Sequence, residues 1–334
     1  MRLAFPDARL VILAGAVLLL GGALSRPQVA VEQAGFDLLA IVDITGSMNV
    51  RDYSDNGRPV SRLEAVKKAL AVMAAQLPCP SKMALGIFAE RQSFLLFEPI
   101  DICVNYAPVE GAIAMLDWRM AWEGDSRVAA GLYRAIDHAR ALKTDLVFFT
   151  DGQEAPPLPA SGGPAFEGQP GVVRGLVVGV GGYELSPIPK FDDRGREIGF
   201  FGQDDVPHES RFGLPPKGAE QRDGFNARNA PFGADVAVGS EHLSSVREPY
   251  LQDLAGKAGL AYARLVDGED LLKKYLAAGS LHARPSSRDL SPWLAGCASA
   301  ALVTLYLIPL LFELLSKRRK STMPGGRVQP RRRK

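Results

Sequence analysis

Three short stretches carry residues whose types and spacing could do chemistry. DITGSM (43–48) follows the apolar run FDLLAIV, FFTDGQE (148–154) ends a second apolar run, and WEGDSRVA (122–129) lies between them. Because ligands of parallel sheets bind beyond the carboxyl ends of the strands, these stretches are expected at one rim. Their carboxylate and hydroxyl oxygens suit a hard divalent cation, Mg²⁺ or Ca²⁺. The sequence predicts these metal ligands: Asp43, Thr45, Ser47, Ser126 and Asp151.

Two other roles for DITGSM compete with a metal site. Asp43 could cap a strand-to-helix turn, or it could be a phosphorylated nucleophile, as in the DKTGT motif of ion-pumping ATPases. The lysine of that motif is Ile44 here, no GDG-type acid pair follows, and no G-x-S-x-G elbow surrounds Ser47 or Ser126. The four histidines are scattered and form no zinc pattern. We therefore expect a binding protein rather than an enzyme.

The metal residues must be positioned by a sheet, and the surrounding sequence predicts one. Apolar strand patterns alternate with helical ones, and Gly46 and Gly152 are expected to let the backbone turn tightly beside the site. The pattern predicts an α/β domain over 33–280, with a mostly parallel central sheet, one antiparallel edge hairpin and helices on both faces. The predicted strands are 36–43, 83–89, 93–100, 145–150, 175–180 and 261–266, and the predicted helices are 62–77, 108–116, 126–142, 247–259 and 268–278.

Residues 183–245 are rich in Gly and Pro and show little periodicity, which predicts an inserted extended loop. Within them, DDRGREIGFFGQDD (192–205) is both acidic and aromatic. It could contact a partner or weakly hold calcium, or it could be a solvated loop.

Both ends of the chain indicate a membrane protein. Residues 1–25 are typical of a signal peptide or N-terminal anchor, and the charge-free run 293–312 predicts a transmembrane helix over 293–315. The basic tail 316–334 is expected in the cytoplasm and beside anionic lipids; it lacks the aromatic interleaving of a nucleic-acid module. The main domain should therefore lie in the periplasm, attached to the inner membrane.

Export permits disulfides, and two cysteines are placed to form one. MALGIFA (83–89) and SFLLFEPI (93–100) predict a hairpin that turns near Arg91. Cys79 and Cys103 are equally distant from that turn, so they should face each other beyond the open end of the hairpin. We predict a Cys79–Cys103 disulfide; two reduced, buried cysteines are the alternative.

Asp43-Ile-Thr45-Gly-Ser47, Ser126 and Thr150-Asp151-Gly152 resemble the metal-ion-dependent adhesion site (MIDAS) of von Willebrand factor A domains. The family pattern is Asp-x-Ser-x-Ser, a distant Thr and a Thr-Asp-Gly turn; Thr45 and Ser126 depart from it but keep the hydroxyl. The resemblance implies that the cation binds a carboxylate of a partner protein.

Finer features resemble the MxaL-type accessory proteins of methanol-oxidation operons: DITGSMNVRDY (43–53), LDWRMAWEGDS (116–126) and TDGQEAPPLP (150–159). That likeness implies a role in maturation of periplasmic quinone-dependent methanol dehydrogenase, through calcium insertion, with the dehydrogenase or sister accessory proteins as partners. A general envelope adhesion or chaperone protein that works with a MoxR-type ATPase is the alternative.

Overall fold

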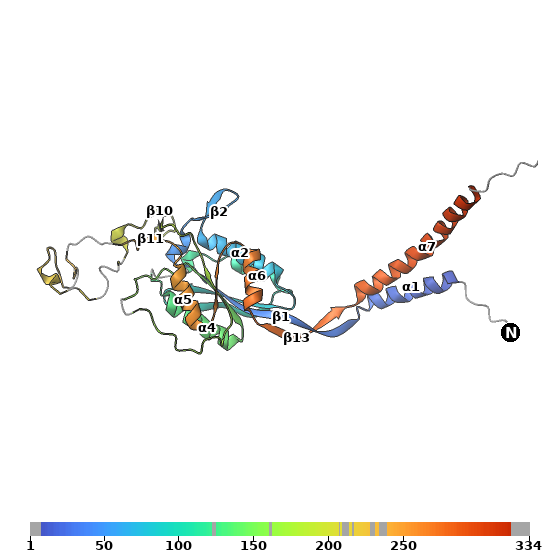
Figure 1. Cartoon of the computed structure of the whole chain (residues 1–334), viewed down its shortest axis with the longest axis horizontal. Coiled ribbons are helices and arrows are strands. Elements are labelled where there is room, and N and C mark those ends of the chain that lie inside the picture. Colours follow the sequence, from blue (N-terminus) through green and yellow to red (C-terminus); the bar gives the residue numbers. More distant parts are fainter. Residues whose placement is uncertain are drawn as a thin grey trace, which may run out of the picture. The chain divides into compact units, whose positions relative to one another are not determined.

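The computed structural model describes residues 8–121, 125–159, 162–206, 208, 214–215, 217–227, 231–233 and 239–321. The chain divides into two compact units, both drawn in Figure 1. One is Gln33–Arg284, and the other combines Met1–Glu32 with Pro285–Lys334.

A mixed seven-stranded sheet forms the centre of the larger unit. Its order is β12–β7–β6–β1–β4–β5, and β13 also pairs with β1. All neighbours from β12 to β4 run parallel, while β4 and β5 form an antiparallel edge hairpin. The predicted α/β sheet with one edge hairpin is therefore confirmed. The strands are β1 (Gln28–Asp43), β4 (Lys82–Ala89), β5 (Gln92–Asp101), β6 (Asp145–Thr150), β7 (Gly175–Gly179), β12 (Ala261–Arg264) and β13 (Leu281–Asp289).

Helices cover both faces of this sheet because successive strand residues point to opposite sides (Figure 1). Leu38, Ala40 and Val42 of β1 pack in one buried core with α2 (Arg62–Gln76), α3 (Tyr106–Ala114) and α6 (Gly268–Ala278). Leu39 and Ile41 pack in a second core with α4 (Val128–Leu142) and α5 (Glu248–Ala258). The end of β1 is thereby held rigidly between two apolar layers.

Two strands extend beyond what hydrophobic periodicity predicts. β1 begins at Gln28 rather than at residue 36, and β13 forms where no strand was expected. The first seven residues of β1 are exposed or half-buried. Backbone pairing between β1 and β13, rather than apolar burial, therefore makes these segments strands.

The described parts of 183–245 contain regular elements where the sequence predicts an insertion or an extended loop. They include two antiparallel pairs, β8 (Ser186–Pro187) with β11 (Leu243–Ser244), and β9 (Pro189–Phe191) with β10 (Glu197–Phe200). 3₁₀ turns follow at Gln203–Asp205 and Ala219–Gln221. Strands this short carry too few residues for a period to be recognised in the sequence. A further hairpin, β2 (Tyr53–Asp55) with β3 (Arg58–Val60), precedes α2.

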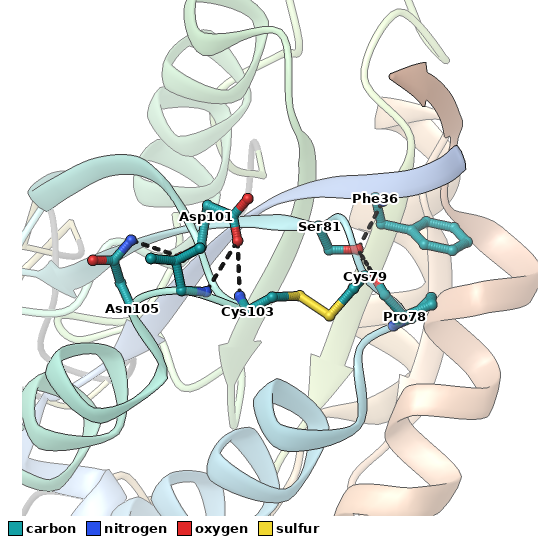
Figure 2. The surroundings of a disulfide bond; sticks show 8 residues. Phe36, Pro78, Cys79, Ser81, Asp101, Cys103 and Asn105 are labelled. Carbon is teal, nitrogen blue, oxygen red and sulfur yellow. Dashed lines mark hydrogen bonds between the residues drawn. A yellow bond between two sulfur atoms is a disulfide. The ribbon is translucent and has the colours of Figure 1, made fainter. Parts of the chain in front are cut away.

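Cys79 and Cys103 form the predicted disulfide, which closes the open end of the β4–β5 hairpin (Figure 2). Hydrogen bonds hold both flanks in place. Ser81 Oγ accepts from Phe36 N at 2.9 Å, which ties the segment before β4 to β1. Asp101 Oδ1 accepts from Cys103 N at 2.9 Å on the other side. The disulfide prediction from hairpin register is confirmed.

The terminal unit contains α1 (Ala8–Leu24) and α7 (Ser291–Ser321). The two helices pack against each other, and the small side chains of Ala16 and Ala298 are buried. No helix in the described part of the chain is both long and apolar enough to cross a membrane. The predicted span over 293–315 is therefore not confirmed. Most of the predicted basic tail, residues 322–334, lies outside the described residues.

Candidate metal centre

Asp43 is fully buried at the carboxyl end of β1, and three donors hold its carboxylate. Oδ1 accepts from Thr45 N at 2.9 Å and from Thr45 Oγ1 at 2.7 Å, while Oδ2 accepts from Thr150 Oγ1 at 2.6 Å. Burial and the negative charge of Asp151 raise the pKa of Asp43 to about 7, although these hydrogen bonds oppose the rise. The ionised carboxylate is thus short of positive charge, which a bound cation would supply.

Ser47 and Ser126, two further predicted ligands, carry unsatisfied hydroxyls. Ser47 belongs to η1 (Gly46–Asn49), the turn that follows β1. Ser126 is fixed by its backbone, because Ser126 N donates to Ala155 O at 2.7 Å and its carbonyl accepts from Ala155 N at 2.8 Å. Among the described residues, neither buried Oγ has a hydrogen-bond partner. Such orphaned groups are uncommon in native proteins and call for a ligand or another explanation.

The predicted hydroxyl ligands share one cavity. Thr45, Ser47 and Ser126 all line a hollow of about 500 Å³, and the buried Asp43 accepts a hydrogen bond from the Thr45 hydroxyl. Ser126 precedes α4 but does not cap it, since Arg127 occupies the N-cap position. The tertiary structure therefore brings together three stretches that are far apart in the sequence.

Asp151, the second predicted carboxylate, is engaged by groups that sequence reasoning did not identify. Its Oδ2 accepts from Arg62 Nη1 at 2.7 Å and from Ser244 Oγ at 2.9 Å, and its Oδ1 accepts from Gln153 N at 2.9 Å. Arg62 is fully buried and also pairs with Asp52 at 2.7 Å. Asp151 therefore already has a positive partner, which weakens its role as a direct ligand relative to Asp43.

No sequence signal marked Arg62, because its partners lie up to 182 residues away. Gln153 was also missed, although it directly follows the Thr-Asp-Gly turn. Its Nε2 donates to Glu241 O at 2.9 Å, which fixes the side chain. Its Oε1 is buried without a partner in the described structure, and the residue lines the same cavity. Gln153 thus adds a third orphaned oxygen to the two serine hydroxyls.

The two glycines of the predicted site differ. Gly152 has φ +80°, and a Cβ there would lie 3.0 Å from the Leu251 side chain, so this turn requires glycine. Gly46 has no positive φ and no atom within 4 Å of a Cβ position. The expectation that Gly46 is needed for a tight turn is therefore wrong, because the 3₁₀ turn of η1 tolerates a side chain.

The donor set fits a hard cation. In the described part of the chain, no three His, Cys, Asp or Glu side chains cluster as a metal site. The candidate centre instead combines hydroxyls, one amide oxygen and the carboxylate of Asp43, with Asp151 behind them. Such oxygen ligands suit Mg²⁺ or Ca²⁺ better than zinc.

Part of the chain is similar to a known protein family. The model of the von Willebrand factor type A domain matches residues 38–153. No curated protein matches the chain. An aerotolerance-related membrane protein of Bacteroides fragilis NCTC 9343 is 15% identical and has a TM-score of 0.44, with 73% of this chain and 98% of that chain covered.

Two further solved structures are similar at comparable levels. BatB of Bacteroides thetaiotaomicron is 16% identical with a TM-score of 0.44, over 72% of this chain and 94% of its own. The manganese-loaded TRAP protein of Plasmodium vivax is 12% identical with a TM-score of 0.35, over 79% and 83%. The family match runs from β1 through the turn after β6 and includes all five predicted metal ligands, so this part of the chain is similar to the von Willebrand factor type A domain.

Proposed function

We propose that this protein is a membrane-attached, cation-dependent binding factor. A divalent cation at the Asp43 centre would supply an open coordination position for a carboxylate of a partner protein. Thr45, Ser47 and Ser126 would hold the cation, and Asp43 would balance its charge. The proposed role is binding rather than catalysis.

The observation that carries this proposal is the pair of buried, unpartnered hydroxyls of Ser47 and Ser126 on one cavity. Burying a hydroxyl without a partner costs about 1–3 kcal/mol, so two at one place favour a site built for a ligand. The buried carboxylate of Asp43, which is hydrogen-bonded to Thr45 of the same lining, favours a positively charged ligand. A merely capped turn would need neither serine hydroxyl.

The main domain is proposed to lie in the periplasm, attached to the inner membrane by the terminal unit. α1 and the described part of α7 expose large apolar side chains, among them Leu18 and Tyr306. Exposed apolar patches of this kind mark interaction or membrane surfaces. The Cys79–Cys103 disulfide agrees with an oxidising compartment.

The finer proposal is maturation of a periplasmic quinone-dependent methanol dehydrogenase by calcium insertion. It is supported by the likeness of 43–53, 116–126 and 150–159 to MxaL-type accessory proteins. Deletion of the gene should yield dehydrogenase that lacks calcium, measured by metal analysis of the purified enzyme. Calcium-replete dehydrogenase in the deletion strain would refute this role and favour the general adhesion or chaperone alternative.

The metal proposal is tested with Asp43→Asn in the purified full-length chain. Asparagine keeps the size of the side chain but removes its charge, so the fold should persist while Mg²⁺ or Ca²⁺ binding falls at least tenfold by calorimetric titration. Asp145→Asn is the matched control, because Asp145 is equally buried but begins β6, where it accepts from Ser280 N. Equal cation affinity in wild type and Asp43→Asn would refute the metal centre.

A further inference from the structure

The cavity above the candidate metal centre has an apolar wall that the adhesion motif does not supply. Its lining contains Thr45, Ser47 and Ser126, and its volume of about 500 Å³ is in the range of small-molecule sites. The wall comes from η2 (Trp118–Met120), from β9 and from the segments that flank β9 and β10. The apolar side chains that line it are Trp118, Ile188, Pro189, Phe191, Phe201 and Val206.

Contacts within the fold hold this wall in place. The Trp118 ring stacks on Phe191, with centroids 4.5 Å apart and planes inclined by 27°. Ile188 and Pro189 are buried, and Phe201 N donates to Ile188 O at 3.0 Å. The Glu197 carboxylate on β10 pairs with Arg51, in the loop after η1. The aromatic wall is thus preformed rather than a loose loop.

The carboxylates that line the cavity all have partners within the chain. Asp125 pairs with Arg91 at 2.9 Å, Asp205 with Lys190 at 2.6 Å, and Glu241 with His208 at 2.5 Å. The fourth, Glu154, accepts from Tyr250 Oη at 2.6 Å. Asp125 and Asp205 are thus paired with basic side chains, and Glu154 and Glu241 have hydrogen-bond partners, so each of these four acids is already engaged by another group of the chain.

The cavity therefore offers two complementary surfaces. One is the set of orphaned oxygens on lining residues, Ser47 Oγ, Ser126 Oγ and Gln153 Oε1. Thr45, which is hydrogen-bonded to Asp43, belongs to the same lining. The other is the aromatic wall of Trp118, Phe191 and Phe201, in which Trp118 stacks on Phe191. A ligand that satisfies both must bring a metal-binding group and an adjacent apolar group.

We propose that the cavity takes a bulky apolar or aromatic side chain of the partner, next to the carboxylate that the metal centre binds. This inference rests on the proposed function and adds specificity to it. The partner segment carries an acidic residue close to an aromatic or large aliphatic residue. Partners with an isolated surface acid bind weakly, because only one of the two surfaces is used.

The test uses 3-phenylpropanoate and acetate as probes, with the purified full-length chain in saturating Mg²⁺. Both acids present a carboxylate, but only 3-phenylpropanoate carries a ring that can enter the cavity and leave water. Its affinity should exceed that of acetate at least tenfold, by ligand-detected NMR titration. 2-Phenylethylamine, which carries the ring on a cation, should bind at least tenfold more weakly than 3-phenylpropanoate.

Single substitutions show which side chains produce the preference for 3-phenylpropanoate. Phe201→Ala and, independently, Trp118→Ala should each reduce the preference for 3-phenylpropanoate over acetate to threefold or less, with Mg²⁺ affinity unchanged. Phe200→Ala is the matched control, since Phe200 is 54% exposed on β10 and does not line the cavity. It should leave all affinities at the wild-type value.

The outcomes separate this inference from the proposed function. If Mg²⁺ binds and both acids bind equally, the apolar subsite is refuted while the metal centre stands. Tighter binding of 2-phenylethylamine than of 3-phenylpropanoate would also refute it, in favour of a basic partner. If Mg²⁺ does not bind, the proposed function fails and this inference fails with it.

Discussion

Replacement of either orphaned serine by alanine should raise the free energy of unfolding without metal and lower it, relative to wild type, with metal. Ser47 Oγ and Ser126 Oγ are buried and have no partner among the described residues, so each carries a desolvation cost of about 1–3 kcal/mol. Ser47→Ala or Ser126→Ala removes that cost and leaves only a small void. The free energy of unfolding in EDTA should therefore rise by about 1 kcal/mol in each variant.

Bound metal should make wild type more stable than the alanine variants. A ligand at one hundred times its dissociation constant stabilises the native state by about 2.7 kcal/mol. Wild type should gain this increment in saturating Mg²⁺, whereas the alanine variants lack a ligand oxygen and should gain little. The variants, about 1 kcal/mol more stable in EDTA, should thus be roughly 1.7 kcal/mol less stable in saturating Mg²⁺, the difference between the two effects.

The assay is urea unfolding followed by circular dichroism, in EDTA and in Mg²⁺. Ser93→Ala is the matched control, because Ser93 is also buried but its Oγ donates to Gly131 O at 2.8 Å. Loss of that satisfied bond should cost about 1 kcal/mol in both buffers and leave the Mg²⁺ increment intact. Ser47→Ala or Ser126→Ala variants that behave like Ser93→Ala would refute the reasoning.

Three other predictions follow from the same region and from the hairpin. Arg62→Met leaves Asp151 and Asp52 without their buried counter-charge, so unfolding in urea should show a loss of about 3–5 kcal/mol, partly restored by Mg²⁺. Arg62→Met as stable as wild type in EDTA would contradict this. The pKa of Asp43, raised from 3.8 to about 7, means that the folded state holds its proton more tightly than the unfolded state does. Metal-free stability should therefore fall as pH rises from 4 to 7, by at most about 1.4 kcal/mol per pH unit, and Asp43→Asn should flatten that slope. A slope unchanged in Asp43→Asn would assign the pH dependence to other groups. Loss of the disulfide, which joins residues 24 apart, in a Cys79→Ser, Cys103→Ser double variant should cost about 3 kcal/mol in thermal unfolding, and an unchanged melting temperature would contradict this.

Much of the fold could be predicted because its signals are local. Leu38 to Val42 form an uninterrupted apolar run, which indicates a strand buried on both faces, and the structure places β1 at the centre of the sheet. The hairpin register placed Cys79 opposite Cys103 for the same reason, since a turn fixes the pairing on both sides. The outer part of β1 and β13 escaped prediction because polar, exposed pairing leaves no periodic pattern.

The candidate site also has some features that local sequence predicts and others that it does not. Asp43 and Thr45 are neighbours in a motif, and their hydrogen bond follows from that spacing. Gly152 could be assigned to a turn because only backbone geometry was needed, while the same argument failed for Gly46. Neighbouring residues in the sequence predict the local backbone conformation. They therefore also predict which side-chain oxygens lie at the end of β1.

Only the tertiary structure decided which partners those oxygens have. Arg62 contacts Asp151, 89 residues away in the sequence, and Ser244, 182 residues away. Asp151, a predicted ligand, is therefore paired with a positive charge that no sequence motif indicates. Trp118 meets Phe191 because η2 and β9 both contact η1, the turn after β1, and the Trp118–Phe191 contact forms part of the apolar wall. Charge pairing and burial depend on which distant segments are packed together, whereas strand patterns and turn residues depend on the nearest few positions in the chain. The sequence by itself therefore determined which residues supply candidate ligand oxygens at the end of β1. Packing determined which of these oxygens lack a hydrogen-bond partner among the described residues and which side chains surround them.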